Sequence, residues 1–410
     1  MTFRIALSGL NAATADLNVT ANNIANVNTP GFKRSRAEFS DLFAVSPYGL
    51  AKNEIGAGVK VSGISQQFAQ GNIDFTDNSL DMAISGEGFF TLSRNGAHVY
   101  SRAGNFSVDR NGYVVNNTGD RLQAFPAVPG LPGAAPTFNT GALGDLHLSV
   151  ADAPPSATQN ATVGTNLPAN ATAPTVTPFS ATNAQSYNQS TSMSFYDSLG
   201  VEHTATFYYV KTANPNEWQM YSTVDGTAVG GANTLQYDTS GALIAPAGGT
   251  LALPAYAPTN GAAPMNVTLD LSTSTQFGSS FAVNKLTQDG YAAGQLSGVD
   301  VSDEGVVTAR YTNGQAVPLG QVALTGFANP QGLQQLGDTI WAETYDSGQP
   351  LLGAAGTSAF GKVQSGALEA SNVDLTEQLV NMITAQRDFQ ANAQMISTAD
   401  QVTQTIINIR

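Results

Sequence analysis

Apolar side chains recur every seven residues near the start of the chain. The recurring positions are Phe3, Leu10, Leu17 and Ile24, with Ala6, Ala13 and Thr20 between them. A seven-residue repeat predicts a helix with one narrow apolar stripe, and such a stripe needs a partner. The expected helix covers Arg4 to Val27, because Pro30 and Gly31 are residues that end helices.

A second periodic segment lies near the other end. Asp374, with Glu377 three residues later, predicts the start of a helix. The apolar positions that follow are Leu375, Leu379, Met382, Phe389, Ala393, Ile396, Ala399, Val402, Ile406 and Ile409. Gln386 interrupts the stripe, and a coiled coil tolerates the change of phase after Ile396 as a local change of winding. We therefore expect the two ends to pack together.

Between these helices the apolar side chains recur at every second residue instead of every seventh, which predicts β-strands. Asn-Gly pairs at residues 95–96, 111–112 and 313–314 are typical of hairpin turns. The expected strands are 89–93, 97–102, 106–109, 113–115, 193–195, 203–210, 218–224, 266–271, 306–311, 316–327 and 340–344. The stretch 124–187 is rich in Pro, Ala, Thr, Asn and Gly, and a long loop or domain boundary is expected to start there. A second Gly-, Ala- and Pro-rich stretch, 226–264, interrupts the strands that follow.

The expected fold is multidomain and mainly β, with β domains inserted in one another and the terminal α-helices forming a coiled-coil-like inner domain. We expect residues 1–30 and 372–410 to form that helical domain. A connector with little core of its own follows at 31–70. The inner β domain is predicted at 71–145 and 284–371, and the outer β domain at 146–283.

The amino-acid composition argues against several classes of function. The 410 residues include 16 Lys and Arg against 30 Asp and Glu, a formal net charge of −14, which argues against a nucleic acid or an anionic membrane as partner. The chain has no cysteine, so disulfides and thiolate metal sites are excluded. Its start lacks the pattern of a cleaved secretory signal, and no stretch has the roughly 20 apolar residues of a membrane span. We therefore expect either a cytoplasmic protein or export without a cleaved signal.

Few residues are candidates for catalysis or metal binding. His98, His147 and His203 show no metal-ligating spacing, and His98 and His203 are expected to be ordinary strand residues. The segment 109–112 opens like a calcium loop, but its glycine comes too early and no glutamate closes it. The basic residues at 33–36 are interpreted as a solvated or partner-facing loop. We predict no catalytic, cofactor-binding or metal-binding residue, and no enzyme.

Residues 20–33, TANNIANVNTPGFK, closely resemble the N-terminal signature of the bacterial flagellar rod, hook and hook-associated axial protein family. Residues 80–90 resemble the start of that family's first β domain, and residues 101–106 resemble its next motif. Residues 366–374 through 394–396 are similar to the family's C-terminal signature. The signature residues are Asn22, Asn23, Asn26, Asn28, Thr29, Pro30, Gly31 and Phe32.

The resemblance implies a structural subunit that polymerises helically. The length and the inserted strand domain are typical of members that form a curved hollow hook, a flexible universal joint between motor and filament. Implied partners are other copies, rod and hook-associated junction proteins, the hook cap and the flagellar type III export apparatus, in an extracellular assembly. Self-assembly is expected through Phe3, Leu10, Leu17, Ile24, Leu375, Leu379, Met382, Phe389, Ile396, Val402 and Ile406. A distal rod or hook–filament junction protein, a secreted adhesin-like β protein and a hydrolase are the alternatives.

Overall fold

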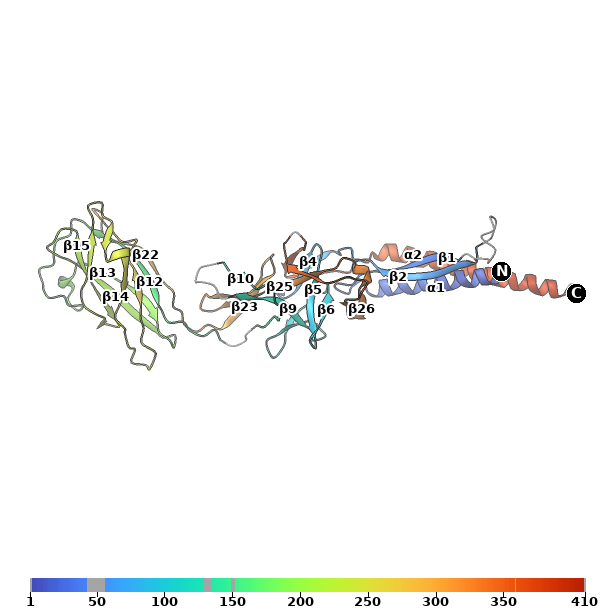
Figure 1. The fold of residues 1–410 in the computed structure, drawn as a ribbon, viewed down its shortest axis with the longest axis horizontal. Helices are drawn as coiled ribbons and strands as arrows, with labels where there is room; N and C mark the ends of the chain where they lie inside the picture. Colours follow the sequence, from blue (N-terminus) through green and yellow to red (C-terminus); the bar gives the residue numbers. More distant parts are fainter. Residues whose placement is uncertain (1, 43–55, 129–134, 149–151, 358, 409–410) are drawn as a thin grey trace. The chain divides into compact units, whose positions relative to one another are not determined.

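The computed structural model describes residues 2–42, 56–128, 135–148, 152–357 and 359–408 (Figure 1). The chain divides into two compact units. The first unit comprises Met1–Val150, Gly298–Arg310 and Ala316–Arg410, and the second comprises Ala151–Ser297 and Tyr311–Gln315. The second unit is therefore an insertion within the sequence of the first. Over the described ranges, no helix is both long and apolar enough to cross a membrane.

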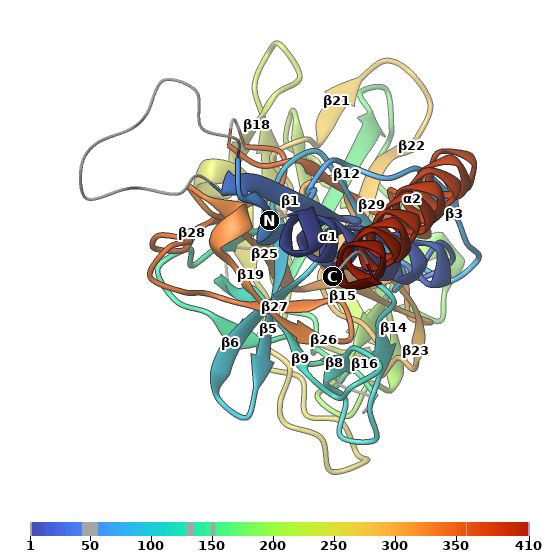
Figure 2. The ribbon, with the colours of Figure 1, turned by 90° about the vertical axis from the view of Figure 1, so that its right-hand side faces the viewer.

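Two helices at opposite ends of the chain pack side by side in the first unit. They are α1, Thr2–Ala25, and α2, Leu375–Asn408 (Figures 1 and 2). Gly9 lies against Asn392, and the Asn23 side chain bonds to that of Gln378, so the helices are antiparallel. The predicted pairing of the two ends is confirmed, and α1 ends at Ala25, two residues before the expected boundary.

Small and polar side chains form the buried seam between α1 and its neighbours. The buried residues of α1 are Ala6, Ala13, Val19, Thr20 and Asn23, and those of α2 are Gln378 and Ala385. The helices approach so closely that a Cβ on Gly9 would lie 2.4 Å from Asn392 Oδ1. Burial raises the pKa of Asp16, and the charge of Asp388 raises it further. A seam with few large apolar contacts and two like charges stabilises the pair only weakly.

A β-hairpin packs along α1 where only a connector was expected. Strands β1, Ser35–Leu42, and β2, Gly58–Gln66, pair antiparallel, and the Val59 amide donates to Ser8 Oγ of α1 at 3.1 Å. The hairpin has little apolar alternation, so its strands were not predicted. Backbone pairing and contact with the helix stabilise it instead. Residues 43–55, between the two strands in the sequence, lie outside the described residues.

The β part of the first unit is built on one large sheet. The strand order is β23-β24-β25-β9-β5-β6-β27-β26. These strands are β5 Phe89–Arg94, β6 Ala97–Ser101, β9 Arg121–Val128, β23 Leu296–Val301, β24 Val306–Tyr311, β25 Ala316–Gly326, β26 Gln334–Gly337 and β27 Ile340–Ala342. Shorter strands flank it: β7 Ser107–Val108, β8 Val114–Val115, β10 Thr137–Phe138, β11 Gly144–Asp145 and β28 Leu351–Ala354. The three predicted Asn-Gly hairpins are confirmed, with Gly96, Gly112 and Gly314 all at positive φ.

Two small pairs of strands join the sequence near the start of this sheet to the segment before α2. Strand β3, Ile73–Phe75, pairs with β30, Ala367–Glu369, and β4, Met82–Ser85, pairs with β29, Lys362–Ser365. The main hydrophobic core lies beneath them and includes Met82, Ile84, Phe90, Leu122 and Leu324. These pairs place Glu369 next to the chain that leaves α1.

The second unit contains two sheets whose side chains form one hydrophobic core. One sheet has the order β13-β14-β15-β17-β18 with β16 paired to β15, and the other has β19-β20-β12-β21 with β22 paired to β12. The strands are β12 Asn160–Pro168, β13 Gln189–Tyr196, β14 Glu202–Lys211, β15 Glu217–Val224, β16 Thr227–Ala228, β17 Asn233–Tyr237, β18 Leu243–Ala245, β19 Thr250–Ala252, β20 Thr268–Asp270, β21 Thr275–Phe277 and β22 Ala282–Gln288. Phe195, Phe207, Tyr209, Trp218 and Leu269 are fully buried in the shared core.

Strand β12 lies in the stretch 124–187, which was expected to be a loop. It pairs with β20 and β21 in parallel and with β22 antiparallel, so it is an interior strand. Val163 and Leu167 are buried, but so are Thr165 and Asn166. Because buried positions of β12 carry polar as well as apolar residues, its sequence does not alternate between the two. The prediction of a loop in this stretch was therefore wrong.

The predicted boundaries of the outer β domain, 146–283, differ from the division in the structure. Because β22 pairs with β12 throughout its length, the second unit continues to Ser297. The turn Tyr311–Gln315 also belongs to it, since Asn313 Nδ2 donates to the Ala292 carbonyl at 2.8 Å. The chain therefore returns to the second unit once more after leaving it.

Candidate self-assembly surface and its anchor

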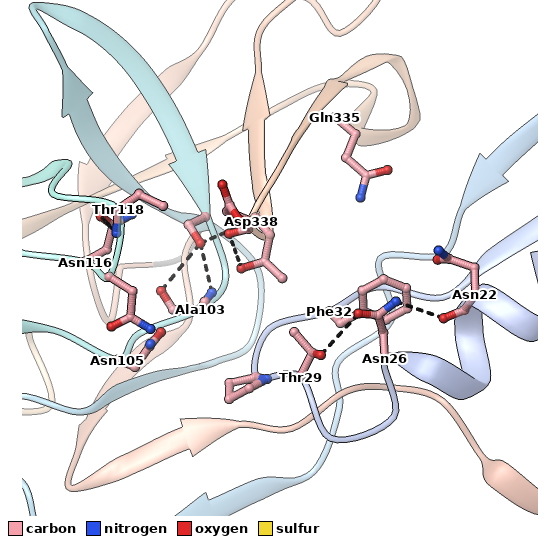
Figure 3. A pocket seen from close by; sticks show the side chains of 14 residues that line it. Asn22, Asn26, Thr29, Phe32, Ala103, Asn105, Asn116, Thr118, Gln335 and Asp338 are labelled. Carbon is pink, nitrogen blue, oxygen red and sulfur yellow. Dashed lines mark hydrogen bonds between the residues drawn. The ribbon is translucent and has the colours of Figure 1, made fainter.

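The signature residues form the turn by which the chain leaves α1. The Asn26 side chain donates to the Asn22 carbonyl at 2.9 Å and accepts from Thr29 Oγ1 at 3.2 Å (Figure 3). Because asparagine side chains can replace backbone partners at a helix end, these bonds stop the helix in a defined turn. Asn22, Asn26 and Thr29 line one side of a polar pocket of about 390 Å³, shown in Figure 3, and Pro30 is also among its lining residues.

Asn23 connects three elements of the first unit. Its Nδ2 donates to the Ser35 carbonyl of β1 at 2.8 Å and to Gln378 Oε1 of α2 at 3.1 Å. Its Oδ1 accepts from the Ser35 amide at 2.9 Å. Both ends of this buried amide are thus satisfied, which fixes α1 against α2 and the hairpin.

Gly31 holds the turn against the β part of the unit. Its amide donates to the Glu369 carbonyl at 2.7 Å, and its φ is +69°. A Cβ here would lie 2.4 Å from the backbone nitrogen of Ala103. Phe32 follows as a buried side chain, whereas Asn28 is exposed.

A buried ionic cluster anchors the segment after the turn. Glu369 Oε1 lies 2.5 Å from Lys33 Nζ and accepts from the Gly71 amide at 2.9 Å, while Oε2 lies 3.2 Å from Arg102. The side chains of Lys33 and Glu369 are 0% exposed. Burial lowers the pKa of Lys33, an effect that the charge of Glu369 opposes. The interpretation of the basic residues as a solvated loop is therefore wrong for Lys33, whose charge is neutralised by a residue far away in the sequence.

The other two basic residues of this segment do lie at the surface. Arg34 pairs with Glu377 at 2.9 Å, and Arg36 pairs with Glu38 at 3.1 Å. Glu377 was predicted to complete the start of α2 together with Asp374. Asp374 Oδ1 does accept from the amides of Thr376 and Glu377, at 2.8 and 3.0 Å, while the Glu377 carboxylate reaches Arg34. The helix start is thus tied to the segment that follows α1.

The structure divides the predicted assembly residues into two groups. Half-buried positions in the helix pair are Leu10, Leu17, Ile24, Met382 and Ile396. Exposed positions are Phe3, Leu375, Leu379, Phe389, Val402 and Ile406. Four further exposed apolar side chains of α2 were not predicted: Val380, Ile383, Met395 and Ile407. A single chain therefore leaves a long apolar surface of α2 uncovered, which we call the α2 surface.

The last turns of α2 extend beyond α1. Asn23 lies opposite Gln378 and Gly9 opposite Asn392, so this antiparallel register places Thr2 opposite about residue 399. All side chains described from 401 to 408 are exposed, including Ile406 at 65% and Ile407 at 67%. Among the residues that the structure describes, no other helix lies opposite this segment, which makes it the clearest candidate for contact with another copy.

Sequence reasoning missed Glu369 and Arg102, since nothing in their local pattern signals a distant partner. It also treated His203 as an ordinary strand residue, yet its ring lies between Asp197 and Asp225. Within the described ranges, no group of three or more His, Asp or Glu residues is arranged to hold a metal ion. Asp109 closes its turn by accepting from the amides of Asn111 and Tyr113, both at 2.8 Å, as expected for a hairpin turn.

Gly31→Ala should destabilise the first unit by about 2–4 kcal/mol, because a positive φ and a backbone clash both oppose the added methyl. Chemical unfolding followed by circular dichroism measures the loss. Gly96→Ala is the matched control: Gly96 has φ +88° but nothing within 4 Å of an added Cβ. That variant should lose only about 1 kcal/mol. Equal losses in both variants would show that the contact of Gly31 with Ala103 is unimportant.

Comparison with known protein families supports the same regions. The chain matches the Flagella basal body rod protein family over residues 3–33 and the Flagellar hook protein FlgE/F/G D1 domain over 83–178. It matches the Flagellar basal body protein FlaE D2 domain over 166–291 and the Flagellar basal body rod FlgEFG protein C-terminal family over 364–409. These matches include the signature turn and both terminal helices.

Full-length relatives are similar throughout. The flagellar hook protein FlgE of Escherichia coli (strain K12) is 43% identical, with all of both chains covered. The corresponding proteins of Salmonella typhimurium and Borreliella burgdorferi are 41% and 33% identical, covering 100% and 98% of each chain. A crystal structure of Helicobacter pylori flagellar hook protein FlgE2 shares the fold with a TM-score of 0.55 at 15% identity, covering 72% of this chain and 100% of that one.

These relatives confirm the resemblance seen in the signature residues and the expected fold class of inserted β domains with terminal helices. The similarity extends over both units, so it does not depend on one short motif. The chain belongs to the flagellar hook protein family, a family of structural proteins.

Proposed function

We propose that this chain polymerises helically into a short, curved, hollow tube that acts as a flexible universal joint and transmits motor torque to the flagellar filament. The observation that carries the proposal is the uncovered α2 surface. Apolar area in contact with water costs roughly 25 cal/mol per Å², and packing against neighbouring copies removes that cost. Membership of the flagellar hook protein family indicates that this tube is located in the flagellar hook.

In this proposal the helix pair forms the innermost layer of the tube, and the self-assembly residues are those predicted from the sequence together with the exposed apolar residues of α2. The seam between α1 and α2 is built from small and polar residues and contains the like charges Asp16 and Asp388. A pair with so little apolar burial gains most of its stability from further packing. Ordering of the helices is therefore coupled to assembly.

The proposed partners follow from the same assembly. The chain binds chiefly other copies of itself, and the ends of the tube meet rod proteins and hook-associated junction proteins. A hook cap and the flagellar type III export apparatus act while the tube grows outside the cell. The net charge of −14 supports a proposal without nucleic acid or membrane insertion.

Negative-stain electron microscopy of the concentrated protein tests the proposal. Curved hollow tubes are the expected result. Straight tubes would instead favour a rod or hook–filament junction protein of the same family, because a joint must bend. Dispersed particles at every concentration and salt condition would contradict self-assembly altogether.

The second unit is proposed to set the curvature of the tube. Deleting residues 151–297 and joining 150 to 298 should leave tubes that are straighter than those of the full chain. The physical reason is that short neutral polar side chains offer many nearly equivalent contacts, so neighbouring copies of the unit slide at little energetic cost. Curvature is measured in micrographs at matched salt, with the full chain as control. Unchanged curvature would refute this role.

A further inference from the structure

A fully buried carboxylate organises one end of the second unit. Asp197 lies in the turn between β13 and β14, and its Oδ1 accepts from the amides of Leu199 and Val201 at 2.8 and 2.9 Å. Its Oδ2 accepts from Asn260 Nδ2 at 2.5 Å and lies 3.2 Å from His203 Nε2. The carboxylate therefore connects its own turn to β14 and to the loop that contains Asn260.

A second carboxylate faces the other nitrogen of the same ring. Asp225 follows β15, and its Oδ2 lies 2.6 Å from His203 Nδ1. Its Oδ1 accepts from the Thr204 amide at 2.9 Å, and Tyr256 Oη donates to its Oδ2 at 3.3 Å. The His203 ring is thus placed between carboxylates from two different turns.

The geometry determines the protonation state of this histidine. A neutral imidazole carries one N–H, so one of the two ring nitrogens would present a lone pair to a carboxylate. Only the imidazolium donates to Asp197 and Asp225 at once. Burial opposes the charge of His203 while both carboxylates favour it, and the balance raises its pKa. The pKa of Asp197 is lowered to about 2 by its hydrogen bonds, despite burial.

We propose that His203 is a protonated clamp that ties together the β13–β14 turn, the β15–β16 turn and the loop containing Tyr256 and Asn260, and that loss of its proton releases them. The second unit is then a pH-responsive part of the chain. This inference does not depend on polymerisation.

The titratable groups around the His203 ring define the pH range over which the clamp is formed. Asp197, Asp225 and the Tyr256 phenol are the titratable groups that face it, and Asn260 is neutral. Glu202, the neighbour of His203 on β14, accepts instead from the Ser194 hydroxyl. Because the folded-state pKa of His203 is raised, its contribution is complete below the ordinary value of 6.5 and is lost as the pH rises through the folded value. The contribution of Asp197 is present above 3.8 and is lost as the pH falls towards about 2.

Ring-nitrogen NMR of the full chain, labelled with ¹⁵N-histidine, tests the protonation state between pH 5 and 9. Both His203 nitrogens should keep imidazolium shifts to a pH above 6.5, the ordinary pKa of a histidine. The signals are assigned by their disappearance in His203→Asn and His98→Gln. Asp225→Asn should lower the His203 midpoint, while its Oδ1 still accepts from the Thr204 amide. A His203 ring that is neutral at pH 6, or whose titration midpoint is no higher than 6.5, would overturn the proposal.

Amide hydrogen exchange tests the release of the loops. The amides to follow are those of Leu199, Val201 and Thr204, with their exchange rates corrected for the intrinsic rate. Their protection should fall as the pH rises through the pKa of His203 in the folded chain. The fall should be about tenfold for each pH unit by which folding raises that pKa. His98→Gln should behave like the parent chain, and Asp225→Asn should lose this dependence. Constant protection in the parent chain, or an unchanged dependence in Asp225→Asn, counts against the clamp.

Discussion

Replacing Val402, Ile406 and Ile407 together by glutamine is expected to raise the critical concentration for polymerisation at least about 100-fold. Each of these side chains is exposed in the single chain and lies in the part of α2 that extends beyond α1. Burying one such side chain contributes roughly 1.5–3 kcal/mol, and each 1.4 kcal/mol changes an association constant tenfold. Sedimentation of the polymer over a range of total concentrations measures the effect.

The same substitutions should leave the stability of the folded single chain nearly unchanged, within about 0.5 kcal/mol, because all three side chains are mostly exposed. Glutamine also keeps the helix propensity of this segment. Thr403→Gln with Thr405→Gln is the matched control, since it changes exposed polar residues on the same turns. If the control impairs polymerisation as strongly as the triple variant, the apolar character of the α2 surface is not what drives assembly.

Glu369→Gln is expected to destabilise the first unit by about 3–5 kcal/mol. The change removes the carboxylate that pairs with both the buried ammonium of Lys33 and the buried guanidinium of Arg102. Removing one partner from a buried ion pair costs far more than the pair itself contributes, because the remaining charge cannot be solvated. Urea unfolding followed by circular dichroism measures the loss.

Glu377→Gln is the control for this prediction. Glu377 also pairs with an arginine, but its side chain is half exposed, so its loss should cost less than about 1 kcal/mol. Adding Lys33→Met to Glu369→Gln should recover part of the stability, since it removes one of the two uncompensated cations. If the two glutamine variants lose equal stability, the buried cluster does not anchor the signature turn as described.

The anchor also explains why the signature turn matters to the helix pair. Gly31 bonds to the Glu369 backbone, and Lys33 bonds to its side chain. Asn23, near the end of α1, bonds to both α2 and β1. The direction in which α1 leaves the β part of the unit is thus determined by a few buried polar contacts.

Local patterns in the sequence were sufficient to predict several features of the fold. Seven-residue spacing predicts both terminal helices because side chains repeat on one helix face at that interval. Asn-Gly pairs predict the hairpins because both residues tolerate positive φ. The residues 20–33 by themselves identify the family that the full-length relatives confirm.

Only the tertiary structure decided which side chains the helices bury and which charges are paired. Ala6 and Ala13 lie in the seam while Phe3 is exposed, because close antiparallel packing favours small residues. Strand β12 is interior although its sequence lacks alternation, and Lys33 and His203 obtain their carboxylate partners by folding. The sequence by itself determined where the terminal helices, the Asn-Gly hairpins and the signature turn occur, since these depend on neighbours along the chain. Burial and ion pairing depend on side chains that only folding brings together, such as Lys33 and Glu369, which lie 336 positions apart, so they required the folded structure.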